Sequence, residues 1–113
     1  MISARKALTE FCVLFNEQKF FEAHEVLELL WREEKKLKSD KTDFYQGLIQ
    51  IAAAFVHYQK GNKESAIRLL DSASKYLKSF KVPFEGVDHA RLLTKSRECA
   101  NKNSAIPSID LLD

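Results

Sequence analysis

Apolar residues recur along this chain with the spacing of α-helices, and this pattern divides the chain into amphipathic segments. The first segment covers residues 3–16, and the second begins at Phe20 after a short polar turn. Because the link is so short, we expect these two helices to form an antiparallel hairpin. The chain has only three glycines and two prolines. Such a composition favours a few long helices over many short strands and turns.

The third segment, from about residue 42 to 59, is apolar on nearly every side. A helix of this kind is normally covered by its neighbours, so we expect it to be the most buried element. Asp40 or Thr42 is expected to cap its start. Its polar exceptions are not scattered but share one stripe about 60° wide. The stripe consists of Gln46, Gln50 and His57, with Ala53 among them.

Two further helices follow. Gly61 suits the left-handed residue after a helix end, and Asn62 suits the N-cap of the fourth helix. Asp88 can cap a fifth helix, and residues 103–113 form a tail whose apolar side chains predict docking on the body. We therefore predict one all-α domain over residues 1–113. Its fold is a compact five-helix bundle, built from two antiparallel helical hairpins and a closing helix.

The net charge and the hydropathy of the chain indicate which kinds of partner and which cellular compartment to expect. The net charge of +2 gives no field strong enough to favour nucleic acid or an anionic membrane. No apolar run approaches the ~20 residues that span a bilayer, and the first residues lack the form of a signal peptide. We therefore expect a cytoplasmic protein that binds neither nucleic acid nor membrane. Cys12 and Cys99 lie far apart within helical apolar patterns, which predicts two reduced, buried thiols.

The second helix carries the residues that are the best candidates for metal binding or catalysis. His24 and Glu28 lie one turn apart, a spacing that lets them share a hydrogen bond or a metal ion. The run from His24 to Glu28 is similar to the His-Glu-x-x-His motif of zinc proteases, but Glu28 stands where the second histidine would be. The motif is therefore incomplete, and His24 and Glu28 are only weak metal candidates. Trp31 lies beside His24 at the border of the apolar face.

A polar seam is expected where the second and third helices meet. Buried polar groups require partners, so we expect Glu28 or Glu25 to accept a hydrogen bond from Gln46 or Gln50. Three explanations of the seam stay open: a structural network that fixes the register of the two helices, a small-molecule or partner site, and a metal or hydrolytic site. The candidate site residues are Glu22, His24, Glu25, Glu28, Trp31, Gln46, Gln50 and His57.

Three blocks of sequence occur in a recognisable order. They are Phe-Asn-x4-Phe-Glu-Ala-His-Glu-Val-Leu-Glu-x2-Trp at 15–31, Tyr-Gln-Gly-Leu-Ile-Gln-Ile-Ala-Ala-Ala at 45–54, and Gly-Asn-x3-Ala-x2-Leu-Leu at 61–70. This combination resembles the family called domain of unknown function 309. The resemblance covers about residues 8–93 and leaves the tail at 103–113 outside it. It implies a small, all-helical, cytoplasmic protein with no established activity. The residues that match the family's motif positions are Glu22, His24, Glu25, Glu28, Trp31, Gln46, Gly47 and Gln50.

The function most consistent with these observations is binding. We expect an interaction module centred on a polar groove between the second and third helices, with an unknown small molecule or protein as partner and no cofactor. The chain would act as a monomer or a homodimer. The alternative is a metal-dependent hydrolase that uses His24 and Glu28 with a divalent metal. No complete catalytic motif, glycine-rich phosphate loop or serine elbow is present, so whether the protein is an enzyme stays open.

Overall fold

Five helices make up the part of the chain that the computed structural model describes, residues 2–112. Within these residues there is no strand, only an isolated bridge between Phe84 and Val87 in the last connection. The all-α prediction is therefore confirmed. The helices are α1 (Ala4–Asn16), α2 (Phe20–Lys36), α3 (Thr42–Gln59), α4 (Lys63–Leu77) and α5 (His89–Lys102).

Side-chain caps fix the starts of three helices. Ser3 Oγ accepts a hydrogen bond from the Lys6 N–H at the start of α1. The Asn62 and Asp88 side chains likewise accept hydrogen bonds from backbone N–H groups at the starts of α4 and α5, as the sequence predicted. Each cap satisfies one backbone donor that the first turn leaves without an intrahelical partner. These helix starts were predictable because a cap is a contact between near neighbours in sequence.

The predicted cap of α3 is wrong. The N-cap position is held by Lys41, and neither Asp40 nor Thr42 caps the helix. The reason is a local turn built on Ser39. The Ser39 hydroxyl accepts from the Lys41 N–H at 3.1 Å, and the Thr42 hydroxyl donates to the Ser39 carbonyl at 2.8 Å. Thr42 is thereby drawn into the turn and becomes the first residue of the helix instead of its cap.

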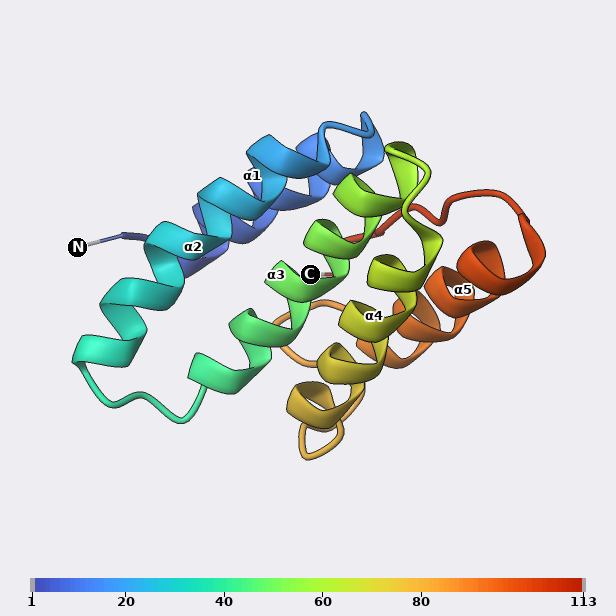
Figure 1. Ribbon diagram of the computed structural model, residues 1–113. Coiled ribbons are helices and arrows are strands. Elements are labelled where there is room, and N and C mark those ends of the chain that lie inside the picture. The colour runs from blue at the N-terminus through green and yellow to red at the C-terminus, as the bar shows by residue number, and fades with distance from the viewer. Residues whose placement is uncertain (1, 113) are drawn as a thin grey trace.

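The central position of α3 organises the bundle. Figure 1 shows α3 between α2 and α4, with α1 packed on α2 and α5 packed on α4. More residues of α3 are buried than of any other helix, which confirms the prediction from its apolar pattern. Three rings join α1, α2 and α3. The Phe15 and Phe20 centroids are 4.9 Å apart, and each lies within 6 Å of the Phe55 centroid.

A second aromatic cluster holds the connection between α4 and α5. Phe44 of α3 packs against Phe80, Phe84 and His89 with centroid distances of 4.8–5.5 Å. His89 is buried, and its Nε2 lies 3.2 Å from the Phe80 carbonyl oxygen. The imidazole therefore ties the first turn of α5 to the connection that follows α4.

The tail after α5 docks on the body, as its apolar residues predicted. Ile109 is 5% exposed, and its backbone N–H and C=O both bond to the Asn16 side chain. In Figure 1 the C-terminal segment runs back from the end of α5 towards the middle of the molecule. No helix within residues 2–112 is both long and apolar enough to cross a bilayer.

Gly47 lets α3 and α4 approach closely. A Cβ atom placed on Gly47 would lie 2.5 Å from Leu77 Cγ and 2.7 Å from Leu77 Cδ2. Leu77 is itself 2% exposed, so it has little freedom to move away. The missing side chain is therefore a packing requirement of the α3–α4 contact.

We expect Gly47→Ala to lower the free energy of unfolding by about 1–3 kcal/mol, because overpacking a core has that effect. This loss would appear although alanine favours a helix by up to ~1 kcal/mol over glycine. Denaturant titration measures the change. In a Leu77→Ala background, Gly47→Ala should lower the free energy of unfolding by much less, since the clashing atoms are gone. Gly47→Ala with wild-type stability or better would contradict the close-packing explanation.

Both cysteines are buried and unpaired, and burial raises the pKa of the Cys12 thiol to about 11. Nearly all of Cys12 is therefore protonated at pH 8, and the thiolate is the reactive form. We expect a disulfide reagent at pH 8 to label the native protein slowly and the denatured protein fast at both positions. Fast stoichiometric labelling of native protein would show that the thiols are accessible.

Candidate functional site

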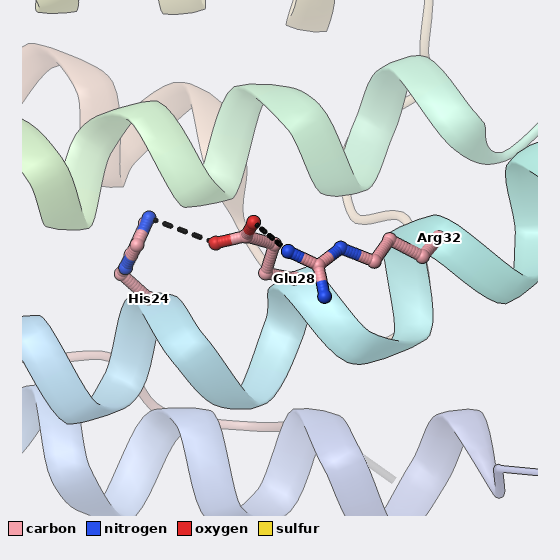
Figure 2. A network of polar contacts seen from close by, with 3 residues as sticks. All are labelled: His24, Glu28 and Arg32. Atoms are coloured by element: carbon pink, nitrogen blue, oxygen red, sulfur yellow. Dashed lines mark hydrogen bonds and ion pairs between the residues drawn. The ribbon is translucent and has the colours of Figure 1, made fainter.

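A chain of three polar side chains runs along α2. His24, Glu28 and Arg32 are spaced four residues apart, so all three lie on one side of the helix. Arg32 Nη2 donates to Glu28 Oε1 at 2.7 Å, and His24 Nε2 lies 3.2 Å from Glu28 Oε2. Figure 2 shows the three side chains on the side of α2 that faces α3. The Glu28 side chain is 31% exposed, so this network is open to solvent at its edge.

The predicted hydrogen bond across the two helices is not formed. Within residues 2–112, Glu28 bonds to His24 and Arg32 of its own helix, and no hydrogen bond joins Glu25 or Glu28 to Gln46 or Gln50. Arg32 explains the difference. Its guanidinium offers a short, charge-assisted contact one turn away, which an amide on another helix does not match.

The polar stripe of α3 lies where the sequence placed it. Gln46, Gln50 and His57 are half-buried, as is Ala53 between them. We call these three polar residues, together with His24, Glu28 and Arg32, the polar face. Two of its atoms have less than 1 Å² of exposed surface and no hydrogen-bond partner within residues 2–112. They are Gln50 Oε1 on α3 and His24 Nδ1 on α2. A buried polar atom without a partner is uncommon and energetically unfavourable.

The other predicted site residues lie outside this network. Glu22 and Glu25 are exposed. Glu22 lines a pocket of about 400 Å³ at the start of α2, with Phe21 and with Gln59 of α3 among the other lining residues. Trp31 is half-buried and is covered by Lys35, whose Nζ lies 4.7 Å from the ring centroid. This contact is a cation–π interaction within α2.

The donor set does not fit a metal centre. Within residues 2–112 no group of three or more His, Cys, Asp or Glu side chains is arranged to hold a metal ion. His24 and Glu28 supply two donors, whereas zinc sites use at least three protein ligands. In addition, the Arg32 guanidinium already bonds to the Glu28 carboxylate.

Sequence reasoning did not single out Tyr45. This residue of α3 is fully buried, and its hydroxyl has no hydrogen-bond partner within residues 2–112. Burial raises the pKa of this hydroxyl, so it stays protonated at any physiological pH. Its position in an otherwise apolar, buried helix was the available signal, because a buried tyrosine normally needs a partner for its hydroxyl.

The fold and the polar face define a class: small all-α bundles in which a charged helix flanks a buried central helix. The chain belongs to the family described as a domain of unknown function (DUF309), whose model matches residues 8–69. It is also similar to the uncharacterized protein YpuF of Bacillus subtilis (strain 168). The two are 34% identical over 91 residues, which cover 78% of this chain and 51% of that relative. This chain therefore spans about half the length of the relative, and the resemblance noted in its motifs is confirmed.

We expect Glu28→Gln to change the free energy of unfolding by less than about 1 kcal/mol, because partly exposed ion pairs one turn apart contribute little. The matched control is Glu25→Gln, which changes an exposed carboxylate on the same helix. Thermal or denaturant melts of the two variants make the comparison. A loss of 2 kcal/mol or more at Glu28 alone would show that the network serves the fold.

Proposed function

We propose that this protein is a binding module whose contact surface is the polar face of α2 and α3. One observation carries the proposal: each helix presents an enclosed polar atom without a hydrogen-bond partner, His24 Nδ1 and Gln50 Oε1. Folded proteins satisfy nearly all such atoms, and exceptions call for an explanation. A ligand that supplies the missing hydrogen bonds is that explanation.

The unpaired atoms indicate the chemistry of the ligand. Gln50 Oε1 is a hydrogen-bond acceptor. When His24 Nε2–H donates to the Glu28 carboxylate, Nδ1 of the neutral ring is an acceptor too. The polar face therefore suits a ligand with N–H donors, such as an amide or amine group of a small molecule or a protein segment. The proposal involves no chemical step, and it takes the protein to be cytoplasmic, as the sequence predicts.

The metal-dependent hydrolase is the competing hypothesis, and it has only the two donors His24 and Glu28, which lie in contact. Metal content separates the two. The protein should be purified without chelators and analysed beside His24→Ala. Stoichiometric divalent metal in the wild type that is lost in the variant would favour the hydrolase over the binding module.

We expect Gln50→Met to leave the free energy of unfolding unchanged or to raise it. Methionine has a similar length, and the substitution removes a buried acceptor that bonds to nothing within residues 2–112. The matched control is Gln59→Met, at an exposed glutamine near the end of α3 whose Nε2 donates to the Gln18 carbonyl. Denaturant titration of both variants gives the comparison. If Gln50→Met lowered the free energy of unfolding by more than about 1 kcal/mol, Gln50 would be needed for stability, and this would oppose the proposal.

The same variants test binding. A set of small amides and amines should shift the backbone and imidazole NMR signals of the polar face in the wild type. These shifts should disappear in Gln50→Met and persist in Gln59→Met. If no compound shifts those signals, or if Gln50→Met binds as the wild type does, the polar face is not the contact surface.

A further inference from the structure

The Asn16 side chain holds the main chain of the tail. The Ile109 N–H donates to Asn16 Oδ1 at 2.7 Å, and Asn16 Nδ2 donates to the Ile109 carbonyl at 2.9 Å. The amide of Asn16 thus pairs with one residue of the tail through both backbone groups, as a neighbouring strand would. This contact recognises an extended main chain, and the burial of the Ile109 side chain adds an apolar requirement at the same position.

A second pair of contacts holds the main chain three residues further on. The Leu112 N–H donates to the Gly86 carbonyl at 2.7 Å, and Arg5 Nη1 donates to the Leu112 carbonyl at 3.1 Å. Gly86 has a φ of +77°, and a Cβ atom there would clash with the Leu112 carbonyl oxygen. Glycine therefore lets the main chain of the tail lie directly against the connection between α4 and α5.

Part of the surface that holds the tail stays open, although Ile109 is buried and Ile106 and Leu111 pack partly buried against the core. Ile109 is buried, but Ser108 and Asp110 on either side are exposed, and Leu112 is 47% exposed. Beside Ile109 there is an open pocket of about 240 Å³. It lies between the tail and the first turn of α5 and is lined by Asp88, Arg91, Leu92, Ser108, Ile109, Asp110 and Leu112. The surface can therefore accommodate a bulkier segment than the one it carries.

The connection to the tail favours its release. Residues 103–105 are exposed, and residues 103–112 have no helix or strand. Segments with few buried contacts open at a fraction of the free energy of global unfolding. The tail also lies outside residues 8–69, which match the family model.

We propose that the surface formed by Arg5, Asn16 and Gly86, which we call the tail site, docks an extended segment of a partner protein. The partner residue bonded to Asn16 is apolar and branched, like Ile109, and a bulkier neighbouring side chain fills the open pocket. Recognition through main-chain hydrogen bonds with one side-chain pocket is an established mode of peptide binding. Residues 106–112 act as an internal ligand that competes with the partner. This proposal is independent of the polar face.

The test uses a fluorescent peptide with the sequence of residues 104–112 and the full chain with Ile109→Asp. A buried aspartate without a counter-charge expels the tail, while the tail site keeps its own residues. We expect the peptide to bind this variant at least tenfold more tightly than the wild type, whose tail competes. Adding Asn16→Ala should weaken binding about tenfold, since two hydrogen bonds are lost. The matched control, Asn101→Ala, removes another exposed asparagine, whose Nδ2 bonds to the Arg97 carbonyl, and should leave binding unchanged.

Three results would overturn the proposal. The folded Ile109→Asp chain fails to bind the peptide, or Asn16→Ala binds it unchanged. Alternatively, the wild type forms a dimer that Ile109→Asp dissociates, which would assign the tail site to a second copy of the chain.

If Ile109→Asp does not fold, hydrogen exchange of the wild type decides the matter. The Ile109 and Leu112 amides should exchange at least tenfold faster than the buried amides of α3, because the tail opens alone. Exchange of these two amides at the α3 rate would mean that the tail never leaves, and would overturn the proposal.

Discussion

The burial of α3 on most of its circumference is the constraint on which the remaining structure depends. An apolar helix of this kind is stable in water only when other helices cover it, so α2 and α4 must pack on its two sides. The α4 side requires Gly47, because Leu77 occupies the space that a side chain would take. The Phe15–Phe20–Phe55 cluster then brings α1 to the same core. Each neighbour of α3 is thus fixed by apolar contact.

The polar face follows from this constraint. Polar residues on a buried helix are tolerated only along a line where the covering helices leave it partly exposed, and Gln46, Gln50 and His57 occupy such a line. On α2, Glu28 bonds to His24 and Arg32 of its own helix and imposes nothing on α3. The two helices are therefore held by apolar packing, and His24 Nδ1 and Gln50 Oε1 stay enclosed without a hydrogen-bond partner among the described residues.

The tail site depends on the same core in a different way. The α1 and α2 hairpin and the α4–α5 connection each pack on α3 through aromatic rings, and the tail then bridges α1 and that connection. The tail is held by hydrogen bonds to its main chain and by apolar side chains, of which Ile109 is the only fully buried one between residues 103 and 112. The bundle is thus closed by a segment that adds Ile109 to the apolar core and packs Ile106 and Leu111 against it.

The sequence by itself determined the helices, the caps at Asn62 and Asp88 and the two buried thiols, because these follow from interactions between residues within four positions or from periodic burial. It also placed His24, Glu28 and the α3 stripe correctly on their helices. It did not determine which partners those side chains take. Thr42 lost its capping role to a turn at Ser39, and Glu28 bonds to Arg32 instead of to a glutamine of α3. The pairing of Asn16 with Ile109, 93 residues away, was decided only by the tertiary structure. Competition between nearby partners and contacts between distant segments depend on the relative positions of packed helices, which residue spacing does not specify.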